Sequence, residues 1–277
     1  MPSIPITEAG IYDLTAKQYH ANPCPAFSIS RSFLADIILK SPLHAHFKSS
    51  ELNQTEEDDS VDSKVMRMGK AMHELALGNE SAVIVIDKKD WRTNEAKELR
   101  DAAIADDKTP MLTHEMEKAR KAVEALGYKF SGTNEQTYIW QRDGIWCRAM
   151  LDSVTDDGYI EDYKTTAGSA EPASWTRNHL YGDLLDMQVA WYIEAYEKLK
   201  GKACKGFRFI VQEQKAPYAF SIINCDLETI KLGQSRIEKA FAVAKHCLAT
   251  DNWPGYGTVW ATPPAYVIQD WENRNAS

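Results

Sequence analysis

Two runs of β-branched and aromatic residues, Ile145–Val154 and Tyr159–Thr166, constrain the fold of this chain more than any other feature. Both runs alternate with the period of two that is typical of strands. Residues 155–158 (TDDG) separate them, and the Asp-Asp-Gly portion suits a three-residue hairpin loop in which Gly158 takes the positive φ. The pattern therefore predicts a β-hairpin near the middle of the chain.

The register of this hairpin brings acidic side chains together. With a three-residue loop, Asp152 falls directly opposite Asp162, and the two Cβ atoms lie about 5 Å apart. Lys164 shares their face of the sheet because it lies two residues beyond Asp162, whereas Glu161 and Tyr163 point to the other face. Adjacent carboxylates repel each other, so either a cation lies between them or one of them carries a proton.

We favour a divalent cation between the two carboxylates. Carboxylate oxygens suit Mg²⁺, for which Mn²⁺ can substitute, and a neighbouring ammonium can stabilise charge that develops on a phosphate. The alternative is that Asp152 caps a strand end while Asp162 and Lys164 form a solvated ion pair, because short motifs also occur by chance.

A helical stretch that begins at Lys64 places a histidine beside an apolar stripe. At helical spacing the stripe contains Val65, Met68, Met72 and Leu75. His73 is displaced from the stripe, and the small Gly69 one turn away lets another backbone approach the imidazole closely. By composition alone, such a histidine is more often a packed side chain than a metal ligand.

Taken together, these residues resemble a known nuclease motif. Asp152, followed by Asp162-Tyr163-Lys164, resembles the core of the PD-(D/E)XK nucleases. The wider chain, from about residue 29 to about residue 256, resembles the RecE-type exonucleases of that superfamily, which are relatives of the lambda-exonuclease and RecB nuclease groups. Leu151 stands where the family motif has proline, which alters the local turn but removes no ligand. The resemblance implies an α/β, restriction-endonuclease-like core with a central mixed β-sheet flanked by helices.

The resemblance also implies a set of metal ligands. The segment MGKAMHELAL is similar to the RecE and RecB helix whose histidine adds a nitrogen ligand, which here is His73. With Asp152, Asp162 and the carbonyl of Tyr163, it would hold one or two Mg²⁺ ions. Lys164 would position or activate the water for in-line attack on phosphorus.

Three further residues are catalytic candidates. Glu135 begins a strand predicted over residues 135–141 and matches an acidic group near the metal in the family pattern, although strand-end glutamates are usually solvated. Gln188 and Tyr192 lie one turn apart on a helix predicted over residues 184–200. A similar Gln-x-x-x-Tyr in RecB- and RecE-like nucleases has Gln orienting the lysine or a phosphate and Tyr bracing the scissile strand. The alternative is an ordinary edge of an amphipathic helix.

Two groups of residues are candidates for DNA binding. Ser30, Arg31 and Ser32 stand at the start of a helix predicted over residues 30–39 and could bind phosphate, although helix capping alone explains the serines. Arg67 and Lys70 lie on the same predicted helix as His73 and are candidates for phosphate contacts.

The composition limits the kind of protein that this chain can be. A formal net charge of −8 argues against a generally basic coat, so DNA would have to contact a local basic channel in an acidic body. The N-terminus lacks a signal peptide, and no apolar run has the length of a membrane span. We therefore expect a cytoplasmic protein of a bacterium or a phage-infected host, with no membrane partner. The five cysteines include no C-x-x-C pair, which indicates reduced thiols and excludes the iron–sulfur staple of some RecB-like nucleases.

The chain is expected to form one nuclease domain over residues 1–277. It would comprise N-terminal helices (1–63), a catalytic core (64–225), and a C-terminal helix and tail (226–277). Residues 6–18 are predicted to be helical, residues 51–63 to form a mobile acidic loop, and residues 167–183 to form a mobile connection. A second hairpin, over residues 206–214 and 218–225, is predicted to widen the sheet.

The expected function is that of a metal-dependent 5′→3′ exonuclease on linear double-stranded DNA, which produces 3′ single-stranded overhangs for recombination. The partners would be double-stranded DNA ends and a single-strand annealing protein. Because a chain of charge −8 attracts DNA poorly, we expect a ring-shaped trimer or tetramer that encloses the duplex, with tryptophans of the tail at a subunit contact. The alternatives are an endonuclease or single-strand nuclease of the same fold, and a non-catalytic DNA-binding protein.

Overall fold

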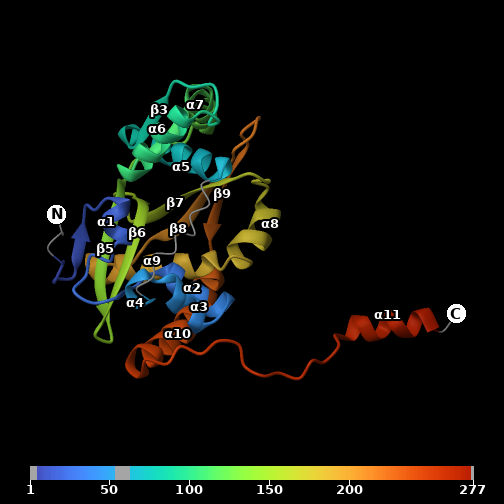
Figure 1. The fold of residues 1–277 in the computed structure, drawn as a ribbon. Coiled ribbons are helices and arrows are strands. Elements are labelled where there is room, and N and C mark those ends of the chain that lie inside the picture. The colour runs from blue at the N-terminus through green and yellow to red at the C-terminus, as the bar shows by residue number, and fades with distance from the viewer. Residues whose placement is uncertain (1–4, 54–62, 276–277) are drawn as a thin grey trace.

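The computed structural model describes residues 5–53 and 63–275 and is built around one mixed sheet (Figure 1). The sheet has seven strands in the order β1-β5-β6-β7-β8-β9, with β2 joined to β6. Strands β7 and β8 are parallel, as are β2 and β6, and the other neighbouring pairs are antiparallel. The strands span Gly10–Tyr12 (β1), Ser28–Ile29 (β2), Thr133–Arg142 (β5), Ile145–Val154 (β6), Tyr159–Thr166 (β7), Gly206–Glu213 (β8) and Phe220–Cys225 (β9).

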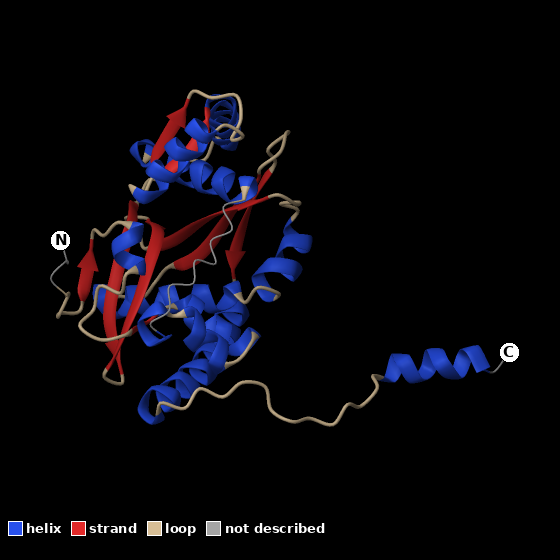
Figure 2. Ribbon diagram, in the orientation of Figure 1, coloured by secondary structure: helices blue, strands red, loops and turns tan. Residues whose placement is uncertain are grey.

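Helices cover both faces of this sheet (Figure 2). On one face, α2, α9 and α10 pack on strand side chains such as Trp140 and Phe209, around the buried Trp191 of α9. On the other face, α5 and α7 pack on Tyr163 and Ile210. These five helices span Arg31–Leu39 (α2), Lys64–Ala76 (α5), Thr113–Leu126 (α7), Leu185–Lys200 (α9) and Leu227–Thr250 (α10). The predicted α/β fold with a central mixed sheet flanked by helices is confirmed.

The remaining elements lie around this core. A small parallel sheet of β3 and β4 lies with α6 beside α5 and α7 (Figure 1). The five cysteines are free thiols. Within residues 5–53 and 63–275, no helix combines the length and the apolar character that a membrane span needs. These elements span Ala16–His20 (α1), Pro42–Lys48 (α3), Ser50–Asn53 (α4), Glu80–Ala82 (η1), Val83–Ile86 (β3), Asn94–Ala105 (α6), Thr109–Leu112 (β4), Pro172–Trp175 (α8), Thr176–Tyr181 (η2) and Ala265–Asn275 (α11).

Two predicted segments differ from the structure. Residues 6–18 are not one helix, because Gly10–Tyr12 pairs with β5 and the capping box of Thr15 starts helix α1 only at Ala16. Residues 167–183 are not an irregular connection but contain α8 and the π-helix η2, which are anchored by the buried Trp175 and Leu180. Of the predicted acidic loop, residues 54–62 lie outside the described part of the chain.

The central hairpin has the register that the sequence predicts. Ser153 pairs with Glu161 and Val154 with Ile160, Gly158 has a φ of 92°, and the Thr155 N–H donates to the Tyr159 carbonyl over 2.9 Å. This ladder ends next to Asp152. Because β6 and β7 part there, the backbone of β7 is open towards the carboxylate of Asp152.

Candidate active site

Three neighbouring strands place three carboxylates in one row. Continuing the β6–β7 register by one residue sets Asp152 opposite Asp162. In the β5–β6 pair, Asn134 faces Ser153 and Gln136 faces Leu151, so Glu135 lies opposite Asp152. Glu135 has a φ of 52°, which interrupts the ladder at that position. The structure thus brings together Glu135, Asp152 and Asp162, which are widely spaced in the sequence.

Asp152 is at the centre of this row and has two donors. Its Oδ2 accepts a hydrogen bond from the Tyr163 N–H over 2.9 Å and lies 3.1 Å from His73 Nε2. The other ring nitrogen of His73, Nδ1, lies 3.8 Å from Glu135 Oε1. Burial by itself would lower the pKa of His73, but the carboxylate of Asp152 outweighs it and raises that pKa to about 9. Helix α5 therefore places an imidazole between two of the three acids.

Asp162 is the most enclosed of the three acids. Its side chain is 1% exposed, and Lys164 Nζ lies 2.5 Å from Oδ1. The Gln188 amide of α9 donates to Oδ2. Burial, reinforced by the charge of Asp152, raises the pKa of Asp162 to about 6. Asp162 Oδ1 has the Lys164 ammonium as its ion-pair partner, and no other donor reaches it among the described residues.

Lys164 and Tyr163 show how β7 divides its side chains between the two faces. The Lys164 side chain is 30% exposed and reaches Asp162. The Tyr163 ring points the other way, is buried against α5, and donates its hydroxyl to Gln212 over 2.5 Å. Only the Tyr163 backbone turns to the acids, since its N–H points at Asp152. In an extended backbone, the N–H and the carbonyl of one residue point in the same direction. The Tyr163 carbonyl, which the family resemblance implies as a metal ligand, therefore points towards the acids.

Glu74 is an acidic neighbour that the sequence analysis missed. Among the residues that the structure describes, His73, Glu74 and Glu135 each have a potential ligand atom within 4.8 Å of those of the other two. Asn79 donates to Glu74 over 2.8 Å and to Glu135 over 3.4 Å, so the two carboxylates share one amide. Glu74 directly follows His73 on the same helix, and this position is the feature of the sequence that could have marked it as a candidate ligand.

Residues Gln188 and Tyr192 on α9 both lie near the acids. The Gln188 amide donates to Asp162, whereas the family pattern has this glutamine orienting the lysine or a phosphate. Tyr192 is a partly buried side chain, and burial raises its pKa well above the ordinary value, with Asp152 and Asp162 contributing in the same direction. The candidate Gln-x-x-x-Tyr pair therefore forms the wall of the site on the α9 side.

The residues at the start of α2 have mainly structural partners. Ser30 caps the helix by accepting from the Phe33 N–H over 3.4 Å, and its hydroxyl lies 3.0 Å from that of Ser32. The Arg31 guanidinium donates to the carbonyls of Asp183, over 3.1 Å, and Leu184, over 2.8 Å. Burial lowers the pKa of Arg31, and the charges of Tyr192 and Asp162 act against that shift. Capping accounts for the serines, and the Arg31 guanidinium binds backbone carbonyls just before α9.

A cavity of about 530 Å³ on the α5 side reaches the row of acids at Glu135. Glu135 and Glu74 form part of its wall, and Arg67 and Lys70 line it from α5. Arg67 is largely buried, with its guanidinium 5.4 Å from the centre of the Trp91 ring, whereas Lys70 is exposed. Of the two predicted phosphate contacts on α5, Lys70 is thus the one with an accessible cation.

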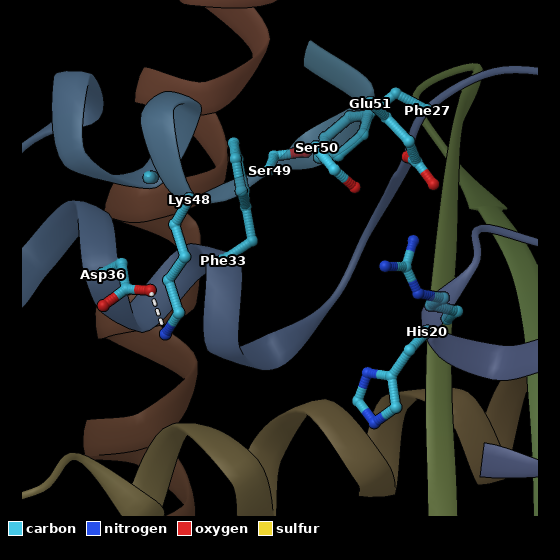
Figure 3. Close-up of a pocket in the computed structure, with 10 residues that line it drawn as sticks. His20, Phe27, Phe33, Asp36, Lys48, Ser49, Ser50 and Glu51 are labelled. Atoms are coloured by element: carbon cyan, nitrogen blue, oxygen red, sulfur yellow. Dashed lines mark hydrogen bonds and ion pairs between the residues drawn. The ribbon is translucent and has the colours of Figure 1, made fainter. Parts of the chain in front are cut away.

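A second, smaller pocket of about 160 Å³ lies under α2, α3 and α4 (Figure 3). Its lining includes His20, Glu51 and the Lys48–Asp36 ion pair, whose atoms lie 3.1 Å apart. Arg148 completes the lining, but its Nη1 is occupied by Asn22 and Ser28. None of the three acids lines this pocket, so we place the candidate active site at the row of carboxylates.

Comparison with known proteins agrees with this geometry. A family model described as a PDDEXK-like domain of unknown function (DUF3799) matches residues 30–259. The chain belongs to this PDDEXK-like family. No curated protein matches the chain. Among solved structures, it is similar to a crystal structure from Eubacterium rectale named "Putative exonuclease", with a TM-score of 0.65 and 15% identity over 94% of this chain and 98% of that one. At that identity, the likeness shows a shared fold alone.

The donor set of this PDDEXK-like protein fits a divalent metal ion. Three carboxylates and an imidazole are hard or borderline ligands that suit such ions. Asp152 and Asp162 are neighbouring, largely buried carboxylates whose burial and mutual repulsion raise the pKa of Asp162, and this repulsion is costly unless a cation binds between them. PD-(D/E)XK nucleases generally use divalent metals, and Asp152, Asp162, His73 and the Tyr163 carbonyl are the groups that would hold one here.

Substitution of His73 by Gln is expected to flatten the pH dependence of metal-free stability in this PDDEXK-like domain. The folded-state pKa of about 9 exceeds the ordinary 6.5, so the contribution of His73 is fully present below pH 6.5 and is lost as the pH rises through 9. The stability difference between wild type and variant should therefore shrink by on the order of 2 kcal/mol over that interval. Urea unfolding of the chelator-treated proteins measures it, and a difference independent of pH would contradict the His73–Asp152 ion pair.

Proposed function

We propose that this PDDEXK-like protein is a metal-dependent exodeoxyribonuclease of the RecE type, which digests linear double-stranded DNA from 5′ to 3′. The observation that carries the proposal is the row of Glu135, Asp152 and Asp162 with the Lys164 ammonium 2.5 Å from its buried end. Acids that repel each other destabilise a fold, and a metal-binding phosphodiesterase centre gives them a role. Mg²⁺ is the proposed ion, and Mn²⁺ is its proposed substitute.

When bound, the metal supplies Lewis acidity and stabilises negative charge on the phosphate. The residues of this chain have distinct tasks around it. Lys164 places a positive charge beside Asp162, where it can orient an attacking water and stabilise the phosphorane-like charge. Gln188 fixes the rotamer of Asp162 by donating to Oδ2. His73 and the Tyr163 N–H fix Asp152 in the same way.

The groups of the site lie at different depths. The exposed fraction is 1% for the side chain of Asp162, 14% for that of Asp152, and 28% for those of His73 and Glu135. A substrate would therefore meet His73 and Glu135 first and Asp162 last. The proposal of an exonuclease rather than an endonuclease rests on the resemblance to the RecE-type exonucleases.

A duplex labelled separately at each end tests this proposal in the presence of Mg²⁺. We expect the label at the 5′ terminus to be released first as small products, the 3′ strand to persist as single-stranded DNA, and a covalently closed circle to stay intact. Cutting of the circle would show an endonuclease, and early release of the 3′ label would reverse the proposed polarity. Absence of cleavage on any DNA would favour a non-catalytic DNA-binding protein.

The product suggests the partner. A 3′ single strand released beside the enzyme is the substrate of an annealing protein, so we propose that such a protein accepts it during recombination. We also propose that several copies of the chain close around the duplex as a trimer or tetramer. The charge of −8 supports this, because topological enclosure retains DNA without long-range electrostatic attraction.

A further inference from the structure

The chain beyond α10 leaves the body as an extended arm (Figure 1). Its root is fixed on the body: the Pro254 carbonyl accepts from the Leu43 N–H over 3.1 Å, and the Trp253 ring lies 4.8 Å from that of His46. We call residues 257–275 the C-terminal arm. All of them are exposed, and they end in α11, which Figure 1 shows far from the rest of the molecule.

The C-terminal arm carries large apolar side chains in water. Trp260 is 97% exposed, Tyr266 73% and Trp271 67%. Val267 and Ile268 of α11 are also exposed. A helix of 11 residues is too short to be stable alone in water, so α11 needs a surface on which to pack. Solitary exposed apolar residues are common, but a run of them on one unsupported segment marks an interaction site.

We propose that the C-terminal arm docks on a second copy of this chain, against an apolar ridge formed by α2 and α3. The ridge consists of Leu39, Leu43 and Phe47, which are 52%, 48% and 49% exposed. Leu43 and Phe47 lie one turn apart on α3, so they share a face. Each copy would give its arm to a neighbour and receive another.

Position and reach support a second copy as the occupant. The ridge lies at the root of the departing arm, since Leu43 is also the residue that binds Pro254. Two copies whose ridges lie near each other can therefore each dock their arm on the other copy. If each arm instead docks on the ridge of the next copy in a cyclic arrangement, the copies close into a ring. The extended residues 257–264 span roughly 26 Å, enough to cross from one body to the next. Folding back onto its own ridge would instead require the arm to reverse direction beside its root.

The area of the arm supports the same occupant, and its charge opposes the contact only weakly. The described arm contains Asp270, Glu272 and Arg274, a net charge of −1, which leaves −7 on the rest of the chain. The exposed parts of Val259, Trp260, Tyr266 and Trp271 together offer about 700 Å² of largely apolar surface. That area is close to the roughly 800 Å² per partner of a stable protein–protein interface.

Light scattering of the full chain tests the proposal. Wild type is expected to have the mass of an oligomer at micromolar concentration, and the double variant Trp260→Ser/Trp271→Ser that of a monomer. Gln269→Ser, on the same helix, is the matched control and should leave the mass unchanged. A monomeric wild type would overturn the proposal, including the case of an arm folded onto its own body. So would a double variant that keeps the wild-type mass.

A mixing experiment identifies the acceptor. Leu43→Ser/Phe47→Ser removes the ridge but keeps the arm, so this variant alone should also be a monomer. Mixed with Trp260→Ser/Trp271→Ser, whose ridge is intact, it should form a pair that neither variant forms by itself. A mixture without such pairs would overturn the ridge as the acceptor. Because none of these residues lies near the acids, the outcome is independent of whether the proposed nuclease activity is found.

Discussion

Asp162→Asn is expected to lower the rate of DNA cleavage by about three orders of magnitude or more. The substitution removes an anionic ligand, and each 1.36 kcal/mol of lost transition-state stabilisation slows the reaction tenfold. The amide oxygen of asparagine still accepts the Gln188 hydrogen bond, so the local packing persists. Initial rates with Mg²⁺ on a linear duplex provide the measurement.

The same variant is expected to be more stable than wild type without metal. Asp162 has its pKa raised from 3.8 to about 6, so the folded state resists its ionisation. The stability associated with the protonated form is fully present below pH 3.8 and is lost as the pH rises through 6. At neutral pH, Asp162→Asn should therefore gain up to about 3 kcal/mol of unfolding free energy, and near pH 3.8 the gain should vanish. A neutral-pH loss of stability would contradict the repulsion between the acids.

Glu161→Gln is the matched control for this prediction. Glu161 adjoins Asp162 in β7 but points to the opposite face, where it pairs with Arg208 and accepts from the Tyr128 hydroxyl over 2.6 Å. Its loss should destabilise the fold by about 2 kcal/mol, since a part-buried cation loses its partner. Cleavage at a temperature where the variant is folded should remain close to wild type. Asp162→Asn is thus expected to raise stability and lower cleavage, whereas Glu161→Gln is expected to lower stability and leave cleavage nearly unchanged.

Lys164→Met is expected to reduce turnover by about two to four orders of magnitude, the usual range for a group that acts on the reacting water or its charge. Methionine keeps the length and the apolar stem of the side chain but removes the ammonium that lies 2.5 Å from Asp162. The ligands remain, so metal binding should persist or strengthen. Single-turnover cleavage and a metal titration of the same preparation separate the two effects.

Lys205→Met serves as the control for Lys164. Lys205 also makes a 2.5 Å ion pair, with Asp157, but on an exposed turn away from the acids. Its substitution should leave turnover within about twofold of wild type, because exposed ion pairs contribute little. Equal rates for Lys164→Met and wild type would show that Lys164 is only a structural partner of Asp162.

Local patterns predicted the centre of the fold well. The alternation in β6 and β7 and the turn residues up to Gly158 set the hairpin register, which alone brings Asp152 opposite Asp162. The 3.6-residue period similarly located the helix that carries His73. These features depend on neighbours within the sequence, so the sequence contains the information needed to predict them.

Other features depend on contacts between distant segments. Gly10–Tyr12 becomes a strand only because β5 offers it an edge, and a three-residue strand has no recognisable period. The family resemblance suggested an acid at Glu135, but its place opposite Asp152 follows from the pairing of β5 with β6, and its left-handed backbone conformation is one that glutamate rarely adopts. Glu74 and the role of Gln188 as a donor to Asp162 also emerge from packing between helices and the sheet.

The most direct test of the central claim is a calorimetric titration of Mn²⁺ into the metal-free protein, with Asp152→Asn titrated in parallel. Asp152 lies between Glu135 and Asp162 and contacts His73, so it is the central member of the proposed ligand set. We predict saturable binding by the wild type and loss of that binding in the variant. Identical titration curves for the two proteins, or no saturable binding by the wild type, would contradict a metal centre at the three acids.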